Sequence, residues 1–259
     1  MFFFDPEHLS RLATSHARAY REARPFPHVV LDGFLPEDVA GALVAEFPKR
    51  QAVPWIAYDS ATERKLETLE EQSLPPLTRH VISQCNGGTL VTFLEQLTGI
   101  SGLVPDPLLW GGGLHQIERG GFLEVHADFN VHPSTHLHRR LNLLLYLNPE
   151  WREEWGGHLE LWGRDMRRCE VRVLPSFNRC VVFNTDRYCY HGHPHPLTSP
   201  HDVTRKSLAL YYYAREAGEG GPTDGHNTLF QARPVTRDGV GARARRVWQR
   251  RRHDRDAAR

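Results

Sequence analysis

The first hundred residues place their apolar positions at helical spacing. Leu9 and Leu12 lie three apart within residues 5–23, where Asp5 can act as N-cap and Pro6 as the first helical residue, so we predict a helix there. Residues 28–32 (HVVLD) follow a proline-rich stretch and predict a short strand.

Two more helices are expected before residue 100. The first opens at residues 34–38 and ends at Pro48, with apolar residues on one stripe: Val39, Leu43, Val44 and Phe47. Residues 77–98 predict a further helix, broken at Asn86-Gly87-Gly88. The intervening residues 59–73 are charged and have few apolar positions, so we expect a solvated helix or a mobile cover rather than core.

From about residue 103 to 215 the pattern changes to short alternating or apolar runs separated by Gly, Pro and Asn. Such runs with regular turns favour a jelly roll or barrel over a parallel α/β sheet. We therefore predict an α+β protein with three regions: helices and a strand over 1–102, a β core over 103–235 and an arginine-rich tail over 236–259. The expected strands are 113–118, 122–129, 140–147, 158–162, 169–174, 179–184, 188–193 and 206–213.

Charge and cysteine content indicate which partners and which cellular compartment to expect. The 32 Lys and Arg nearly balance 31 Asp and Glu, which argues against a surface that coats nucleic acid. The four cysteines form no CxxC pair and are expected to be free thiols in a reducing cytosol. Neither a signal peptide nor a membrane-spanning run is recognisable, so we expect a cytoplasmic protein. Residues 241–259 hold eight Arg and two Asp, and a peripheral helix or a disordered tail is expected there.

The triplet His126-Ala127-Asp128 carries the strongest chemical signal, together with His191, 65 residues after His126. An HxD triplet alone is common by chance in a chain with 16 His. Here the flanking sequence GGFLEVHADFNVH follows a Gly-Gly turn and is rich in strand formers, and in a strand residues i and i+2 point the same way. Two imidazoles and one carboxylate on one face leave half of an octahedral ferrous ion open, as in non-haem iron oxygenases.

Several segments, in this order, resemble the prolyl-hydroxylase branch of the Fe(II)/2-oxoglutarate dioxygenases over roughly residues 25–235. Besides the triplet, they are LLYLNPEW (144–151), GGHL (156–159), NRCVVF (178–183), YHG (190–192) and RKSL (205–208). The resemblance implies a double-stranded β-helix, a cupin-like jelly roll, with the metal at its open mouth and the N-terminal helices buttressing one sheet. It implies His126, Asp128 and His191 as metal ligands, with His193 and His195 in the run HGHPHP as the competitors of His191.

The same resemblance implies where a co-substrate would bind. Arg205 would clamp the distal carboxylate of 2-oxoglutarate, since a guanidinium fork binds a carboxylate bidentately. Ser207 shares its face, whereas Lys206 points to the opposite side of a strand. The hydroxyl of Tyr146 would reach the same carboxylate, although a buried core tyrosine is the alternative, and Gln116 would be another polar contact. The implied cofactors are Fe(II), 2-oxoglutarate and O2, with ascorbate as an optional reductant for reactivation.

The expected reaction is hydroxylation of an unactivated C–H bond of an amino acid, a prolyl peptide or a small biosynthetic metabolite, with release of succinate and CO2. An iron-dependent halogenase is an alternative, which Asp128 disfavours because halogenases leave the carboxylate position empty for chloride. A catalytically silent binding module, and a modifier of a ribosomal or nucleic-acid-associated protein that uses the arginine-rich tail, are two others. We expect a small-molecule or peptide partner, no membrane and no nucleic acid, and the oligomeric state stays open.

Overall fold

The structure, a computed structural model, describes residues 2–68, 70–215 and 225–234. Four α-helices and two short 3₁₀ helices lie in the described chain: α1 (Pro6–Glu22), α2 (Glu37–Glu46), η1 (Glu71–Ser73), α3 (Pro76–Cys85), α4 (Gly88–Thr98) and η2 (Glu153–Trp155). The strands are β1 (His28–Asp32), β2 (Ile56–Asp59), β3 (Glu63–Glu67), β4 (Val104–Pro105), β5 (Gly113–Ile117), β6 (Phe122–Ala127), β7 (His138–Tyr146), β8 (Leu159–Trp162), β9 (Cys169–Val173), β10 (Arg179–Asn184), β11 (His191–His193), β12 (Arg205–Ala214) and β13 (Leu229–Phe230).

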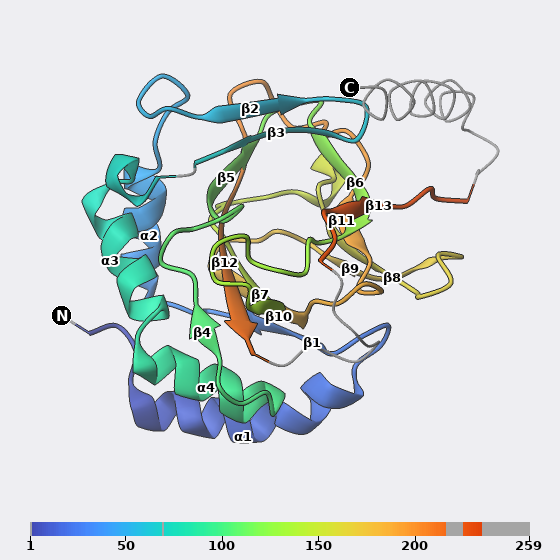
Figure 1. Cartoon of the computed structure of the whole chain (residues 1–259). Coiled ribbons are helices and arrows are strands. Elements are labelled where there is room, and N and C mark those ends of the chain that lie inside the picture. The colour runs from blue at the N-terminus through green and yellow to red at the C-terminus, as the bar shows by residue number, and fades with distance from the viewer. Residues whose placement is uncertain (1, 69, 216–224, 235–259) are drawn as a thin grey trace.

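The strands form one antiparallel sheet that curls into a nearly closed barrel (Figure 1). Its order is β1-β10-β7-β12-β5-β3-β6-β11-β8-β9, and β2, β4 and β13 attach at the sides. Strand β3 pairs with both β5 and β6, so it joins the large half of the sheet to the half that carries β6 and β11. The predicted α+β jelly roll is therefore confirmed.

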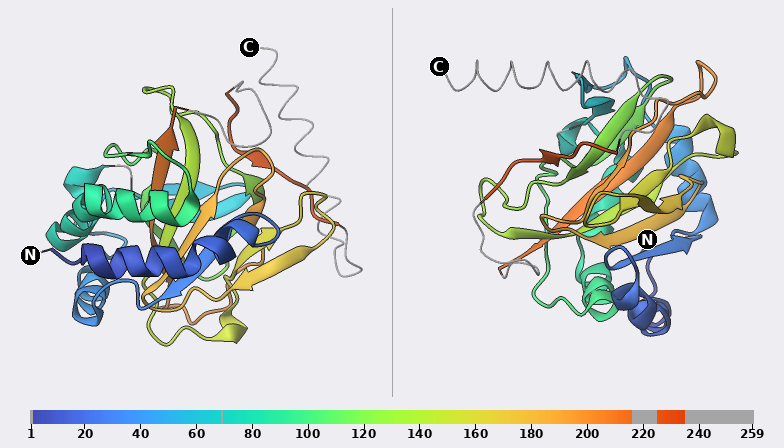
Figure 2. Two further views of the ribbon diagram at one scale, coloured as in Figure 1. Left: turned by 90° about the horizontal axis from the view of Figure 1, so that it is seen from below. Right: turned by 90° about the vertical axis from the view of Figure 1, so that its right-hand side faces the viewer.

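The helices lie together on one side of the sheet (Figure 2). Alternation along β7 explains why: Leu141, Leu143 and Leu145 pack into the large core with the helices, while Leu144 and Tyr146 face the barrel interior. The helix α1 buries Leu9, Ala13 and Tyr20, and its N-cap Asp5 accepts a hydrogen bond from the amide of His8, as the sequence predicts. The helices thus cover the outer face of the sheet and leave its inner face to a site.

The prediction for residues 59–73 was wrong. Most of this segment forms a hairpin of β2 and β3 and then η1, and β3 is part of the barrel wall. Charged residues can line this wall because Lys65 lies between two carboxylates, with its Nζ 3.4 Å from Glu63 and 2.9 Å from Glu67. Their spacing of two residues places all three side chains on one face of the strand.

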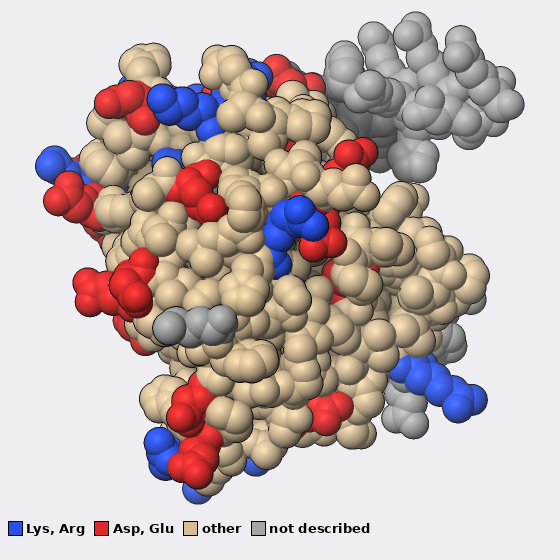
Figure 3. Space-filling view, turned by 90° about the vertical axis from the view of Figure 1, so that its left-hand side faces the viewer, with Lys and Arg blue, Asp and Glu red and all other residues tan. Residues whose placement is uncertain are grey.

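The predicted helices and long strands are present, with ends shifted by a few residues. The helix over 77–98 is broken as expected into α3 and α4. The strands β4 and β13 were not predicted, and the whole of the predicted arginine-rich tail, residues 236–259, lies outside the described residues. No helix in the described part of the chain is long and apolar enough to cross a membrane. On the face over α2 and α3, acidic and basic side chains are interspersed without a patch of one sign (Figure 3).

Candidate metal and co-substrate site

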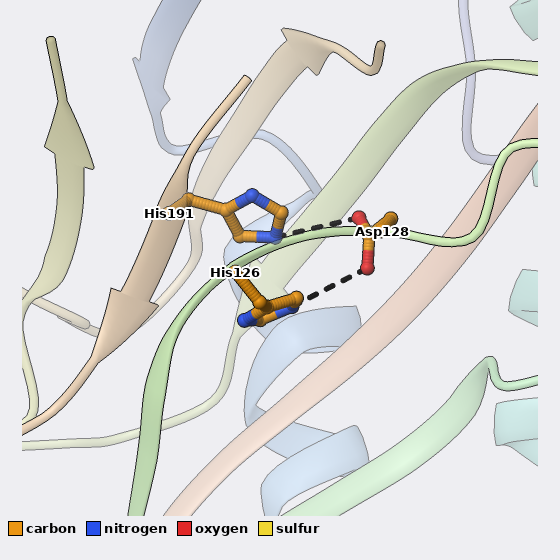
Figure 4. A group of neighbouring side chains, drawn as sticks. All are labelled: His126, Asp128 and His191. Carbon is orange, nitrogen blue, oxygen red and sulfur yellow. Dashed lines mark ion pairs between the residues drawn. The ribbon is translucent and has the colours of Figure 1, made fainter. Parts of the chain in front are cut away.

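Three side chains meet inside the barrel: His126 at the end of β6, Asp128 just after it and His191 at the start of β11 (Figure 4). His126 and His191 are direct partners in the antiparallel ladder, which brings their rings to a centroid distance of 4.5 Å. The Nε2 atoms of His126 and His191 each lie 3.4 Å from an oxygen of Asp128. One ligand atom from each residue lies within 4.8 Å of the others, so the three can hold one metal ion.

Both imidazoles are held in the tautomer that a metal needs. The Nδ1 of His126 lies 2.9 Å from the carbonyl oxygen of Glu124, and the Nδ1 of His191 lies 2.9 Å from that of Cys189. Because a carbonyl only accepts, each Nδ1 carries the proton and each Nε2 keeps its lone pair toward Asp128. Burial also lowers the pKa of His191 to about 4, so its ring is neutral near neutral pH.

The carboxylate of Asp128 is fixed by two residues of β7. Arg139 Nη2 donates to its Oδ2 at 3.0 Å, and Asn142 Nδ2 donates to the same oxygen at 2.8 Å. The Arg139 guanidinium also donates to Asn142 Oδ1 and lies 3.4 Å from the centroid of the Tyr211 ring. Burial alone would raise the pKa of Asp128, but Arg139 and the two imidazoles lower it well below its usual range. Asp128 is therefore an oriented, ionised ligand.

The structure brings His191, and neither His193 nor His195, into the metal-ligand group of the described residues. The side chain of His195 is 65% exposed and lies 3.9 Å from Glu160. His193 is buried but does not join the three ligands.

A second group on the inner surface comprises Arg205, Ser207 and Tyr146. Ser207 and Tyr146 are direct partners between β12 and β7, and Arg205 lies two residues before Ser207, so all three share one face. Arg205 Nη2 lies 3.3 Å from the Tyr146 hydroxyl, and its Nε donates to the carbonyl oxygen of Gly157 at 2.8 Å. Burial raises the pKa of Tyr146, so its hydroxyl stays protonated and can donate.

Arg205 is a buried cation without a countercharge among the described residues. It is 5% exposed, and no carboxylate of the described chain pairs with it. Burial lowers its pKa, which reflects the cost of holding that charge away from water. A bound anion would remove this cost, so the group is suited to a carboxylate ligand.

Gln116 lies apart from this group. In the ladder between β5 and β12, Gln116 is opposite Lys206, while His115 is opposite Ser207. Residues directly opposite in an antiparallel pair point to the same side, so Gln116 faces away from Arg205 and His115 faces the interior. Gln116 Nε2 instead donates to the hydroxyl of Thr204 at 3.1 Å.

Sequence reasoning missed four contributors to the site. Arg139 and Asn142 have no motif of their own; the inward phase of β7 could have pointed to Asn142, but a register shift in the ladder with β12 places Arg139 inward. Gly157 was noted only as part of the segment GGHL, but a Cβ there would lie 2.6 Å from the side chain of Leu197 and 3.0 Å from that of Arg205. Its φ of +71° also favours glycine. Phe230 of β13 packs 5.6 Å from the ring of His126, and nothing in the sequence indicated that contact.

Comparison with known proteins agrees with this geometry. Residues 112–213 match the sequence model of the 2OG-Fe(II) oxygenase superfamily, whereas the curated proteins give no match. A prolyl-4-hydroxylase from Pseudomonas putida superposes with a TM-score of 0.55 at 18% identity, covering 79% of this chain and 100% of that one.

Two more solved structures share the fold. A prolyl hydroxylase from Trichoplax adhaerens, in complex with a hypoxia-inducible factor peptide fragment, gives a TM-score of 0.56 at 16% identity and covers 80% of this chain and 91% of its own. The non-haem, α-ketoglutarate-dependent carbocyclase SnoK of nogalamycin biosynthesis gives a TM-score of 0.52 at 16% identity and covers 94% of both chains. At these identities the likeness establishes the fold alone.

The residues present fit the two cofactors of this superfamily. His126, Asp128 and His191 supply the neutral nitrogen and carboxylate ligands that Fe(II) takes, and Arg205 supplies a buried cation for the distal carboxylate of 2-oxoglutarate. The matched sequence segment, the antiparallel barrel and the ligand triad thus agree: residues 112–213 carry the sequence pattern of the 2OG-Fe(II) oxygenase superfamily, and the fold is like that of prolyl hydroxylases.

Proposed function

We propose that this protein hydroxylates an unactivated C–H bond of an amino acid, a prolyl peptide or a small polar metabolite, with 2-oxoglutarate as co-substrate. The observation that carries the proposal is the pairing of an iron-ligand triad with a buried, uncompensated Arg205 on the same inner surface. Bound Fe(II) and 2-oxoglutarate together supply an oxidant that inserts one atom of O2 into a C–H bond, while the other atom enters succinate as CO2 leaves.

The chain's own residues orient and shield the reactants. The hydrogen bonds from Arg139 and Asn142 fix the orientation of Asp128 before any metal binds. The guanidinium of Arg205 and the hydroxyls of Tyr146 and Ser207 would hold the distal carboxylate. The ring of Phe183 packs 4.8 Å from His191 and excludes water from that side of the site.

A polar substrate is favoured by the inner wall beside the site. Glu63, Lys65 and Glu67 lie on one face of β3, and the hydroxyl of Tyr58 donates to Glu67 at 3.2 Å. Two carboxylates against one ammonium leave one excess negative charge in this group, which suits a substrate with amine or hydroxyl groups. The presence of Asp128 within the ligand triad argues against the halogenase alternative.

A turnover screen tests the proposal. The Fe(II)-loaded protein is incubated with 2-oxoglutarate, ascorbate and panels of free amino acids, prolyl peptides and polar metabolites, and succinate is measured alongside product mass. We expect one class to raise succinate formation and to gain one oxygen atom, and Asp128→Ala to abolish both signals. Failure of the metal-loaded protein to bind 2-oxoglutarate would refute the proposal.

A further inference from the structure

His193, the last residue of β11, is buried in the barrel but is neither a candidate metal ligand nor one of the co-substrate contacts named above. It is 5% exposed, and its Nδ1 has no hydrogen-bond partner among the described residues. Most buried polar groups in folded proteins are hydrogen-bonded, because an unpaired one loses its contacts with water and gains nothing. An unpaired imidazole nitrogen beside a ligand site therefore points to a missing ligand.

The backbone holds His193 firmly in this place. The ladder between β11 and β6 shifts its register between His191 and His193, so that His193 lies opposite Leu123. At Gly192 the two strands approach so closely that a Cβ would lie 2.9 Å from the carbonyl oxygens of Leu123 and Glu124. The position of His193 is thus set by the sheet rather than by contacts of its own ring.

The backbone brings His193 and Arg205 to the same end of β8, because Gly192 pairs with Glu160 of β8 and Arg205 Nε donates to the carbonyl oxygen of Gly157, just before that strand. Burial is the main cause that lowers the pKa of His193, and among the charges Arg205 contributes most, followed by Lys65. Lys65 already pairs with Glu63 and Glu67, whereas Arg205 has no carboxylate partner in the described chain. An imidazole with a free nitrogen and an unpaired guanidinium at the same end of the barrel can together bind an anion.

We propose that His193 is a further co-substrate contact, whose Nδ1–H donates to the distal carboxylate of 2-oxoglutarate beside Arg205. This inference rests on the proposed function and adds a residue to it. The carboxylate has up to four acceptor positions, so it can take hydrogen bonds from Arg205, Tyr146 and His193 together. His193 thereby helps to bind the co-substrate, and the three candidate metal ligands stay His126, Asp128 and His191.

Binding measurements on metal-loaded protein test the contact without turnover. Titration calorimetry of 2-oxoglutarate into the Mn(II)-loaded protein is compared for wild type, His193→Leu, which is similar in size but has no donor, and His193→Asn, whose amide can replace Nδ1–H. We expect His193→Leu to weaken binding about ten- to a hundredfold, as for loss of a hydrogen bond to a charged group, and His193→Asn to recover much of it. His195→Leu, two residues away and exposed, is the matched control and should bind as wild type does.

Mn(II) affinity without co-substrate is measured for the same variants and should be unchanged. Wild-type affinity for 2-oxoglutarate in His193→Leu would overturn the inference and leave the proposed function standing. A loss of Mn(II) affinity as large as the loss of 2-oxoglutarate affinity would also overturn it, because the effect would then act through His191. Absence of 2-oxoglutarate binding in the wild type would instead overturn the proposed function itself.

Discussion

Replacing Arg139 by Met should destabilise the metal-free protein far more than the metal-loaded protein. Methionine keeps an apolar stem of similar length but removes the charge that faces Asp128, whose side chain is only 11% exposed. At the observed 3.0 Å and an effective dielectric constant of about 20, the attraction between the two charges is about 5.5 kcal/mol. Breaking a buried pair on one side typically costs about 3–5 kcal/mol, which is close to this value.

A divalent ion changes the outcome because it supplies a new countercharge to Asp128. With metal bound, Arg139→Met still loses its stacking on Tyr211 and its hydrogen bonds to Asn142, but the carboxylate is no longer unpaired. We therefore expect the loss in the metal-loaded protein to be under half of that in the metal-free protein. For a chain of this size a loss of 3–5 kcal/mol corresponds to a melting temperature lower by roughly 6–20 °C.

The assay is thermal unfolding followed by circular dichroism, once with a chelator and once with saturating Mn(II). Arg179→Met is the matched control, since Arg179 makes a two-point ion pair with the exposed Asp32, which is none of the three candidate metal ligands. Its loss should be at most about 1 kcal/mol and independent of metal. Equal losses for Arg139→Met with and without metal would refute the assigned role of Arg139 as the countercharge of Asp128.

Three further predictions concern the ligands, the two basic neighbours on β12 and the pH range of stability. Alanine at any of the three candidate metal ligands should abolish Mn(II) binding and succinate formation while the circular dichroism spectrum stays unchanged; a variant that keeps turnover would contradict its assignment. Arg205→Ala should raise the 2-oxoglutarate concentration needed for half-maximal turnover by about two orders of magnitude or more, whereas Lys206→Ala, on the opposite face, should change it less than about threefold. Equal effects would show that the faces of β12 are misassigned. Burial lowers the pKa of His115 to about 4, below the ordinary value near 6.5, so between these pH values the unfolded chain binds a proton that the folded chain does not. The free energy of unfolding should therefore fall by up to about 3 kcal/mol from pH 6.5 to pH 4, and His115→Gln should remove this part of the decline. The measurement is urea unfolding across this pH range; the same pH dependence in the wild type and in His115→Gln would contradict the prediction.

Local patterns were enough to predict most of the fold and the centre of the site. Asp5 and Pro6 mark the start of α1, and the near-continuous apolar runs in β7 and β12 mark strands whose two faces are both buried. The facing of His126 and Asp128 follows from the same period of two, because the backbone is extended there. These features depend on neighbours in the sequence, which is why the sequence alone can predict them.

The features that escaped prediction depend on registers between distant strands. In a strand that alternates strictly, Arg140 would face the same side as Asn142, which is inward. The ladder with β12 instead skips Arg140 and pairs Tyr213 with Arg139, so Arg139 lies on the inner side. The sequence distance from His126 likewise cannot show whether Gln116 or His115 faces inward. That depends on the register between β5 and its neighbours, which the turn at residues 118–121 sets.

The sequence match to the superfamily covers residues 112–213, yet two segments that border the site lie outside it. The hairpin of β2 and β3 precedes the matched region and supplies the charged wall, while β13 follows it and lays Phe230 against His126. Substitutions in these flanks can therefore change which molecules enter without altering a single metal ligand. For protein engineering, this separates two choices: the flanks are the place to vary selectivity, and the central strands are the place to preserve reactivity.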